Sequence, residues 1–309
     1  MNAIINPADM AKYVRSIEAS RKVHWEIDRE VIKGRRFDSE RKYLPDGLSL
    51  LRELPLSDAE MRFASQIQGR TYANVFGLVE RFITAKLLEV GAEHALGNQH
   101  ALEALVRFSD EEIKHQELFR RIEAMIGETM PSGYRFDPDP DEVARAVLSH
   151  STWAVLVLTL HIELFVQLHY RQSIDPDDAL SDLFKDVFLF HWKDECQHVM
   201  LDELELKRHD ALLAPAERER GVDDFIGLVQ AVDGILQQQA RSDAAYFSDH
   251  CGRAVDGDEA AAITAHFLKA YRWQYILSGA SHPRFQSILK AMITEPQMAR
   301  IKDAVAALA

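Results

Sequence analysis

The stretch from Ser57 to Gly91 restricts the fold of this chain strongly, because its helical pattern runs for 35 residues without a proline. Ser57 and Glu60 have the spacing of a capping box, in which each side chain satisfies a free backbone N–H group at the start of a helix. Gly91 suits the end of such a helix. At 1.5 Å per residue, the predicted helix is roughly 50 Å long.

Three more long helices follow in the sequence. They are predicted at about 98–127, 141–173 and 175–210, where Asp175-Pro176 resembles an N-cap followed by a proline at the first helical position. A proline-rich loop near residues 130–140 separates the second helix from the third. Two hairpins of long helices joined by a longer crossover predict an all-α, ferritin-like four-helix bundle.

The rest of the chain is predicted to attach to this bundle within a single ferritin-like domain, residues 1–309. Residues 1–56 are expected to be less regular and to wrap around the bundle, residues 57–210 to form it, and residues 211–309 to add accessory helices. Within this last part, shorter helices are predicted at about 222–249, 258–279, 283–293 and 295–308. No linker rich in Gly, Ser or Pro marks a second domain.

The motif Glu-x-x-His occurs twice, as Glu112 to His115 in the second helix and as Glu195 to His198 in the fourth. Residues three apart share a helix face, so each pair can bind one metal region. A Glu precedes each motif by 32 residues: Glu80 on the first helix and Glu163 on the third. One Glu on each of two helices and Glu-x-x-His on the other two is the ligand pattern of di-iron carboxylate bundles.

The four glutamates lie within apolar helix faces, which predicts that they are buried. A buried carboxylate without a partner is costly, and four together repel one another. Two divalent cations would balance the four negative charges. A lone Glu-x-x-His is more often a solvated helix face, but the complete set favours a two-metal site. Mixed carboxylate and imidazole ligands suit iron or manganese better than structural zinc.

Several neighbours of these residues are further candidates. His191 lies one turn before Glu195 and could add a third histidine ligand; the alternative is a core histidine bonded to a backbone carbonyl. Glu111 and Asp194 each precede a ligand Glu and could bind the outer N–H of the opposite histidine; the alternative is an exposed acid. The residues expected to line a pocket beside the metals are Gly77, Thr84, Phe119 and Gln167.

With these motifs, residues 57–210 resemble the ferritin-like di-iron carboxylate oxygenases. The pattern His191-x-x-x-Glu195-x-x-His198 is most similar to the di-iron arylamine N-oxygenases, the p-aminobenzoate N-oxygenase family. The resemblance implies that one iron is bound by Glu80, Glu112, His115 and Glu195. It implies that the other is bound by Glu112, Glu163, His191, Glu195 and His198.

Other members of this superfamily fit less well. Phe119 stands where a ribonucleotide reductase small subunit would have its radical tyrosine. Val166 and Gln167 stand where methane-type hydroxylases and acyl-carrier desaturases would have a threonine. Two distant cysteines, Cys196 and Cys251, cannot form the iron domain of a rubrerythrin.

The resemblance implies an oxygenase that activates O₂ on two iron ions, with manganese or a mixed Mn/Fe pair as alternatives. Its substrate would be a small organic molecule, N-oxygenation of an aryl amine being the most specific reading, and an external reductase or ferredoxin would supply electrons. A homodimer is common for this architecture. Two other functions stay open: another di-iron hydroxylase or ligand-binding oxidase, and a non-catalytic ferritin-like metal-binding protein.

Charge and composition exclude other partners. The chain has 49 acidic and 36 basic residues and a formal charge of −13, which argues against nucleic acid and against an anionic membrane surface. The sequence shows no secretory signal in its first ten residues, no disulfide framework and no clear spanning segment, since His161 and Glu163 soon interrupt the apolar stretch from Trp153. We therefore expect a cytoplasmic protein.

Overall fold

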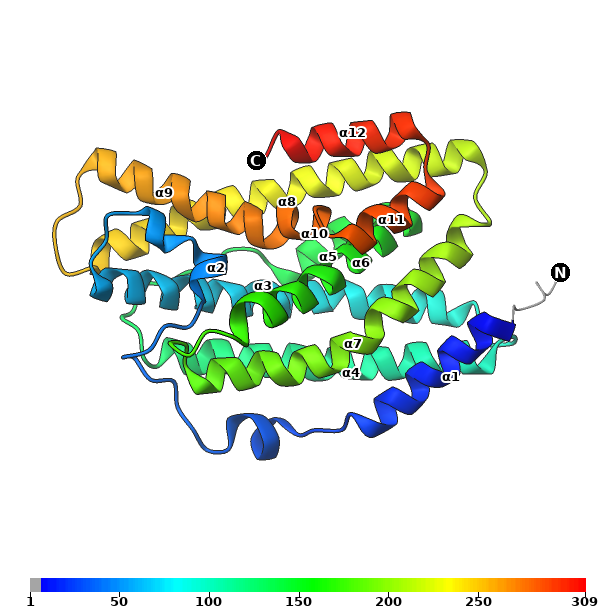
Figure 1. Cartoon of the computed structure of the whole chain (residues 1–309), viewed down its shortest axis with the longest axis horizontal. Helices are drawn as coiled ribbons and strands as arrows, with labels where there is room; N and C mark the ends of the chain where they lie inside the picture. The colour runs from blue at the N-terminus through cyan, green and yellow to red at the C-terminus, as the bar shows by residue number, and fades with distance from the viewer. Residues whose placement is uncertain (1–6) are drawn as a thin grey trace.

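The structure is a computed structural model that describes residues 7–309. Its centre is a bundle of four long helices, α3 (Asp58–Ala92), α4 (Gln99–Gly127), α6 (Thr152–His169) and α7 (Asp182–Asp210). Consecutive helices pack as two antiparallel hairpins, α3 with α4 and α6 with α7 (Figure 1). Within the described residues no strand forms, and an isolated bridge joins Lys42 to Leu180. The protein is all-α, with the predicted bundle connectivity.

The start of α3 has the predicted capping box. The Ser57 hydroxyl accepts a hydrogen bond from the Glu60 N–H, and a Glu60 carboxylate oxygen accepts one from the Ser57 N–H at 2.8 Å. Asn98 caps α4 in the same way, with its side chain accepting from the Ala101 N–H. The other end of α3 differs from the prediction, since the helix continues through Gly91 in right-handed conformation and ends at Ala92.

The third predicted helix is wrong as a single element. It is broken into α5 (Pro140–Leu148) and α6, and a π-helical turn, η3 (Tyr170–Ile174), extends α6. At the break the Ser149 hydroxyl donates to the Ala146 carbonyl at 2.7 Å, and His150 Nδ1 lies 2.9 Å from the same oxygen. These local side-chain bonds compete with the helical ladder. As a result α5 packs against α3, and α6 takes its place in the bundle.

The fourth helix begins at Asp182, with Ser181 before it, and the predicted start at Asp175 is wrong. Contacts with the N-terminal segment hold residues 175–181 outside the helix. The Ser181 N–H donates to the Lys42 carbonyl at 2.8 Å, next to the bridge between Lys42 and Leu180. This pairing between distant segments could not be read from the local sequence.

The N-terminal segment is more regular than expected. It contains α1 (Pro7–Lys22), a π-helical turn η1 (Ile27–Ile32), α2 (Asp46–Ser49) and a 3₁₀ turn η2 (Leu51–Glu53). Helix α1 packs against α4 and α7 and lies along the lower edge of the view in Figure 1. The first six residues of the predicted wrap lie outside the described part of the chain.

The C-terminal helices lie along the opposite side of the bundle (Figure 1). Helix α8 packs on α6 and α3, and α9 packs on α8. Helix α8 begins seven residues before its predicted start, because Pro215 occupies its first position. The bounds of this region are α8 (Pro215–His250), α9 (Gly257–Arg272), η4 (Trp273–Leu277), α10 (Ser278–Ala280), α11 (Pro283–Met292) and α12 (Glu295–Ala306).

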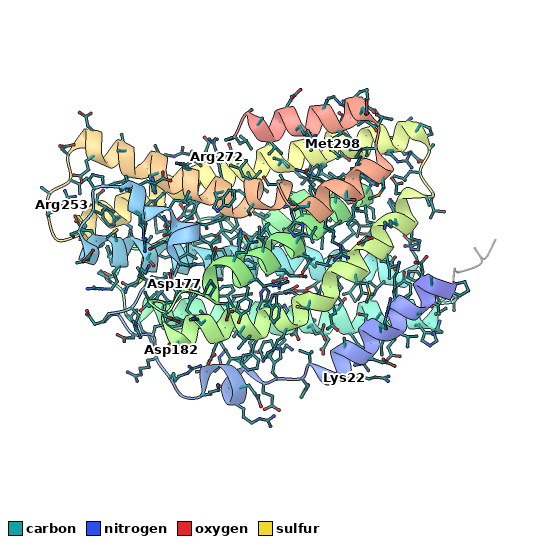
Figure 2. The ribbon with its side chains drawn as sticks, in the orientation of Figure 1. Lys22, Asp177, Asp182, Arg253, Arg272 and Met298 are labelled. Carbon is teal, nitrogen blue, oxygen red and sulfur yellow. The ribbon has the colours of Figure 1, made fainter. Side chains whose placement is uncertain are left out.

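Side chains fill the space between these helices (Figure 2), and buried apolar residues from Tyr13 to Ile301 form one core cluster. The stretch Thr152–Ile174 is long and apolar enough to cross a membrane by length and composition. However, 83% of its apolar window is buried inside the protein, so it is accounted for as the central helix of this core.

Candidate metal centre

The structure brings together all seven sequence-predicted ligands from the four bundle helices. Each is at most 2% exposed, so the cluster lies in the core. Helix α3 contributes one residue, α4 two, α6 one and α7 three. The seven residues are Glu80, Glu112, His115, Glu163, His191, Glu195 and His198.

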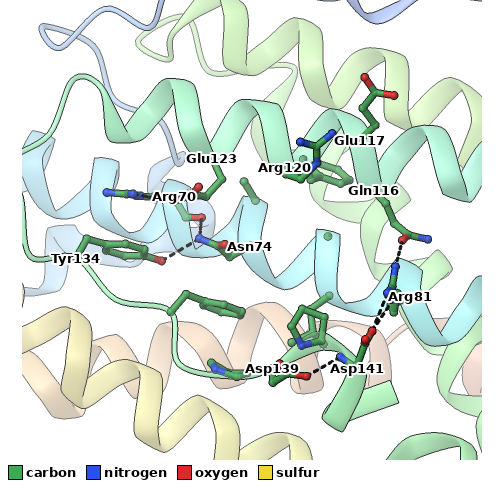
Figure 3. A pocket seen from close by; sticks show the side chains of 17 residues that line it. Arg70, Asn74, Arg81, Gln116, Glu117, Arg120, Glu123, Tyr134, Asp139 and Asp141 are labelled. Carbon is green, nitrogen blue, oxygen red and sulfur yellow. Dashed lines mark hydrogen bonds and ion pairs between the residues drawn. The ribbon is translucent and has the colours of Figure 1, made fainter. Parts of the chain in front are cut away.

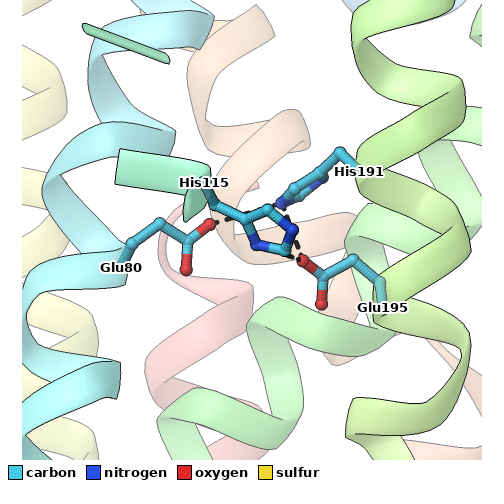
Figure 4. A group of neighbouring side chains, drawn as sticks. All are labelled: Glu80, His115, His191 and Glu195. Atoms are coloured by element: carbon cyan, nitrogen blue, oxygen red, sulfur yellow. Dashed lines mark hydrogen bonds and ion pairs between the residues drawn. The ribbon is translucent and has the colours of Figure 1, made fainter. Parts of the chain in front are cut away.

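One half of the cluster consists of Glu80, His115, His191 and Glu195 (Figure 4). Each offers one ligand atom, and these atoms lie within 4.8 Å of one another. His191 Nε2 is 2.7 Å from Glu195 Oε1 and 3.3 Å from Glu80 Oε1. His115 Nδ1 is 3.3 Å from the same Glu195 oxygen. Two imidazoles and two carboxylates therefore point into one small volume.

The other half consists of Glu112, Glu163, Glu195 and His198, with ligand atoms again within 4.8 Å of one another. His198 Nδ1 lies 2.8 Å from Glu195 Oε2, 3.0 Å from Glu112 Oε1 and 4.0 Å from Glu163 Oε2. The two halves lie side by side within the bundle, because they share Glu195.

Two glutamates span both halves. Glu195 turns Oε1 toward His115 and His191, and Oε2 toward His198. Glu112 turns Oε2 toward His115 Nδ1, at 3.2 Å, and Oε1 toward His198 Nδ1. Such carboxylates can bridge two neighbouring cations.

The grouping of His191 differs from the one that the resemblance implied. His191 lies with Glu80 and His115, and it is absent from the group around His198. Helices α4 and α7 run in opposite directions along the bundle (Figure 1). Moving one turn back from Glu195 therefore reaches the level of His115.

Acidic residues outside the cluster hold two of the histidines. Asp194 Oδ2 lies 3.1 Å from His115 Nε2, and Glu111 Oε2 lies 2.8 Å from His198 Nε2. With the Nε2–H group of each ring donated to a carboxylate, each Nδ1 faces the cluster and is the nitrogen that can bind metal. Both acids are buried, at 0% and 6% exposure, which does not fit the alternative of an ordinary exposed acid.

Sequence reasoning missed the residues that support these two acids. The Trp25 indole N–H donates to Asp194 Oδ2 at 3.0 Å, and Lys114 Nζ lies 2.9 Å from the same atom. On the other side, the Gln197 amide donates to Glu111 Oε2 at 2.8 Å. Lys114 and Gln197 lie inside the two Glu-x-x-His motifs, so their positions were a usable signal. Trp25 lies 89 residues before Lys114 in the sequence, and no local pattern connects them.

The electrostatics of the cluster require a compensating positive charge. Burial, together with the neighbouring glutamates, raises the pKa of Glu80 and of Glu112 to about 8. Burial and Glu195 raise the pKa of Glu163 well above its usual value. For Glu195 itself burial acts in the same direction, but His191 and His198 outweigh it and hold its pKa low. Without cations, the cluster must therefore retain extra protons.

The atoms of the cluster fit two divalent cations. Two carboxylate oxygens of the cluster, Glu112 Oε1 and Glu163 Oε2, are buried and lack a hydrogen-bond partner among the described residues. Carboxylate oxygens and imidazole nitrogens are ligands that iron and manganese accept. The predicted metal-binding role of the seven residues agrees with this geometry and stays a prediction until metal is measured.

A cavity of about 720 Å³ opens between α3, α4 and the loop before α5 (Figure 3). Two of the predicted pocket residues line it, Gly77 and Phe119. The Phe119 ring lies 4.9 Å from the His191 ring, so it separates the cavity from the cluster. A Cβ atom on Gly77 would lie 3.4 Å from that of Phe119. The absence of a side chain at Gly77 keeps this wall thin.

A second, smaller cavity of about 140 Å³ lies among apolar side chains of α3, α5, α6 and α8. Phe76 belongs to its wall, and the edge of that ring meets His191 at a centroid distance of 5.4 Å. Cavities therefore approach the cluster from two sides, and the smaller of them is apolar.

The other two predicted pocket residues line neither of these cavities. The Thr84 hydroxyl donates to the Glu80 carbonyl at 2.7 Å and accepts from the Gln116 amide at 3.0 Å. The Gln167 amide donates to the Glu195 carbonyl at 2.8 Å. Both side chains bond to the helices that carry the ligands, and their assignment to the pocket stays a prediction.

Comparisons with known proteins leave the family of this chain unassigned. No family model matches it, and no curated protein matches it. Among solved structures, it is similar in outline to a mutant R2-like ligand-binding oxidase with an anaerobically reconstituted Mn/Fe cofactor. That similarity has a TM-score of 0.44 and 12% identity, and covers 87% of this chain and 92% of the other.

Proposed function

We propose that this protein is an O₂-activating, non-haem di-iron oxygenase that acts on a small organic substrate. The observation that carries the proposal is the position of Glu112 and Glu195, each of which faces histidines of both halves of one buried cluster. A site for a single ion would not need two spanning carboxylates.

The chain's own residues would hold the metals and fix their surroundings. Glu80, His115 and His191 would bind one ion, Glu163 and His198 the other, and Glu112 and Glu195 would bridge them. Asp194 and Glu111 would keep His115 and His198 in the tautomer whose Nδ1 binds metal. Two ferrous ions, when bound, supply the electrons and the Lewis acidity with which O₂ is activated.

The cavity beside Phe119 is where the substrate would bind. Its wall combines aromatic rings, including Phe119, Tyr134 and Phe136, with polar groups such as Asn74 and Arg120. Seven of the 17 lining residues are charged, so this wall suits a small aromatic molecule that also carries a hydrogen-bonding group. On this basis an aryl amine, oxidised at nitrogen, is the specific substrate class we propose.

The remaining parts of the proposal concern partners. An external reductase or ferredoxin would return the centre to its reduced state. Manganese or a mixed Mn/Fe pair is the alternative metal content. We also propose that the protein acts in the cytoplasm as a homodimer, without nucleic-acid or membrane partners.

Metal loading tests the site. Reduced iron is added anaerobically to metal-free protein, and bound metal is counted after desalting. We expect close to two ions per chain, and loss of both when Glu112 or Glu195 is replaced by Ala. Asp110→Ala is the matched control, since Asp110 is an exposed acid on α4 next to Glu111. Protein that stays free of metal after this loading would overturn the proposal.

Oxygen exposure of the loaded protein tests the reaction. Spectra and products are recorded with aryl amines and, separately, with fatty substrates. N-oxidised aryl amines support the specific proposal, whereas hydroxylated products would replace it by a hydroxylase or ligand-binding oxidase. A many-chain cage by native mass, with no substrate oxidation, would identify a non-catalytic ferritin-like protein.

A further inference from the structure

A line of tyrosines leads away from the candidate metal centre. The ring of Phe76 meets His191 at 5.4 Å, and Tyr72 meets Phe76 at 4.7 Å between centroids. Tyr275 follows at 5.9 Å from Tyr72, and Tyr271 at 6.2 Å from Tyr275. Tyr72 is therefore the first easily oxidised side chain on this side of the cluster.

Hydrogen bonds continue the line to the large cavity. The Tyr271 hydroxyl and the Thr71 hydroxyl both donate to Asp243 Oδ2. Thr71 has one proton and uses it there, so the hydroxyl of Tyr134, 2.9 Å away, donates to Thr71. Tyr134 is half-buried and lines the open cavity, where Figure 3 shows it beside Arg70. Four of the eight tyrosines thus connect the buried cluster with solvent.

The Tyr72 hydroxyl is hydrogen-bonded to His169, and the contact of His169 with Ser278 fixes the tautomer of that imidazole. The Ser278 hydroxyl donates to the Gln274 carbonyl at 3.1 Å, so its oxygen must accept from His169 Nε2–H at 2.9 Å. His169 Nδ1 then carries a lone pair, and it accepts the phenolic proton of Tyr72 at 2.8 Å. Burial lowers the pKa of His169 to about 3, which keeps the ring neutral.

This arrangement suits the oxidation of Tyr72 rather than simple packing. A phenol that loses an electron must also lose its proton, and inside a dry core this requires a neutral base in hydrogen-bond contact. Both side chains are at most 2% exposed, so no water can take that proton. A phenylalanine at position 72 would fill the same space without needing His169 or Ser278.

We propose that Tyr72 is a redox-active residue that protects the metal centre when it is oxidised in the absence of substrate. This inference rests on the proposed function, which supplies the oxidant. Tyr72 gives one electron to the oxidised centre, and its phenolic proton moves to His169 Nδ1. The products are a neutral tyrosyl radical and an imidazolium.

The line then returns Tyr72 to its starting state. Tyr271 gives one electron to Tyr72 through the ring of Tyr275, and its phenolic proton moves to Asp243. Tyr275 keeps its own electron and proton, because its hydroxyl has no hydrogen-bond partner among the described residues. His169 gives its proton back to Tyr72 as that radical is reduced. Tyr134 then gives one electron to Tyr271 and its own proton to solvent, while Asp243 returns the proton of Tyr271. The radical is then on Tyr134, at the cavity. There a thiol from solution supplies one electron and one proton and becomes a thiyl radical, which completes the balance.

A metal-free experiment tests this inference independently of oxygen activation. Metal-free protein is illuminated with soluble ruthenium tris-bipyridine and persulfate, frozen, and examined by electron paramagnetic resonance. We expect a tyrosyl radical that is several-fold weaker after Tyr72→Phe and forms more slowly in D₂O. Tyr43→Phe is the matched control, because Tyr43 is also fully buried but lies off the line.

Two further measurements make the result decisive. Fluorotyrosine incorporated in place of Tyr72 keeps the hydroxyl group and should change the radical's hyperfine pattern, which covers the case that Tyr72→Phe does not fold. Nitrogen NMR of His169 should show the Nε2–H tautomer in metal-free protein. An unchanged radical in both variants, or an Nδ1–H tautomer, would overturn the role of Tyr72 even if the loaded protein consumes O₂. Failure of metal loading would instead count against the proposed function.

Discussion

Asp194 accepts a hydrogen bond from the indole N–H of Trp25 at 3.0 Å, which ties the N-terminal segment to the metal cluster. Lys114 lies over the Trp25 ring, 3.9 Å from its centroid, and also contacts Asp194. His115 and Lys114 lower the pKa of Asp194 although burial raises it, so the carboxylate stays ionised. Asp194 is therefore a fixed acceptor for the outer N–H group of His115.

Replacing Asp194 with Asn should weaken metal binding at the half of the cluster that contains His115. The amide cannot accept as strongly from His115 Nε2, and His115 Nδ1 then binds metal less well. Loss of such an outer partner costs about 10–100-fold in metal affinity. The measurement is competition between the protein and a coloured chelator for each of the two ions.

Glu111→Gln is the matched variant, since Glu111 holds His198 in the other half. We expect the two variants to weaken different ions, and both to leave the protein folded. Equal loss of both ions in each variant would show that the halves are not separately supported.

The metal-free protein should lose stability as the pH rises from about 5 to about 8. The pKa values of Glu80 and Glu112 are raised to about 8, so the folded chain keeps protons that the unfolded chain loses above its ordinary glutamate pKa. A folded state that binds more protons becomes less stable as the pH rises, here by roughly a few kcal/mol. His115, whose pKa is also raised, acts in the same direction.

Urea unfolding at several pH values, with a chelator present, measures this effect. Glu195 has a lowered pKa, so its contribution is lost only at lower pH and lies outside this window. With divalent metal bound, stability should instead rise with pH, because the ligands must lose protons to bind. A flat pH profile in metal-free protein would contradict the buried carboxylate cluster.

The four bundle helices and the clustering of the seven candidate ligands could be predicted from the sequence, because both follow from spacing along a helix. Glu112 and His115 lie on one face by the i, i+3 rule, whatever the rest of the chain does. The position of Asp194 beside the cluster could be predicted in the same way, because Asp194 directly precedes Glu195 in the sequence. Local rules of this kind need no knowledge of distant contacts.

Apart from the local break between α5 and α6, the parts that were predicted incorrectly or missed depend on contacts between distant segments. The start of α7 at Asp182 is set by the pairing of Ser181 with Lys42. The grouping of His191 with His115 depends on the relative direction of α4 and α7. Trp25 reaches Asp194 across 169 residues of sequence. No periodicity in the sequence contains these relationships.

Replacing His191 with Ala should remove one ligand from the half that contains Glu80 and His115. We expect this ion to be lost or bound much more weakly, while the ion held by Glu163 and His198 remains. Metal counting and the spectrum after O₂ exposure are the measurements. His100→Ala is a suitable control, because His100 is exposed on α4. Unchanged iron content and spectrum would remove His191 from the ligand set.

Two substitutions at Gly77 should affect two different properties, the stability of the protein and the binding of substrate. Ala at this position places its Cβ atom 3.4 Å from that of Phe119, which is ordinary contact, and removes a helix-interior glycine. We expect Gly77→Ala to stabilise the protein by about 0.5–1 kcal/mol. Leu is larger and projects into the wall of the 720 Å³ cavity, so Gly77→Leu should weaken substrate binding by roughly tenfold or more.

Thermal unfolding and substrate titration check the two Gly77 variants. Metal content is measured in parallel, since a displaced Phe119 ring could disturb His191. If Gly77→Leu binds metal and substrate as the parent does, the substrate does not use this cavity.

Replacing Asp202 with Asn should stabilise the metal-free protein near neutral pH. Asp202 is 1% exposed and neither carboxylate oxygen has a hydrogen-bond partner among the described residues. Burial raises its pKa well above the usual value, so the folded state loses stability as the pH rises past that of the unfolded aspartate. Asn carries no charge and avoids this loss, which we estimate at about 1–3 kcal/mol.

The pH dependence identifies the cause. Near pH 4 the Asp202 carboxyl is protonated in the folded protein, so parent and Asp202→Asn should have nearly equal stability, and their difference should grow toward pH 8. Asp210→Asn on the same helix is the control. It should lower the free energy of unfolding, because Asp210 accepts hydrogen bonds from Trp153 and Arg218. If Asp202→Asn destabilises the protein at every pH, the carboxylate is satisfied in solution and its burial carries no cost.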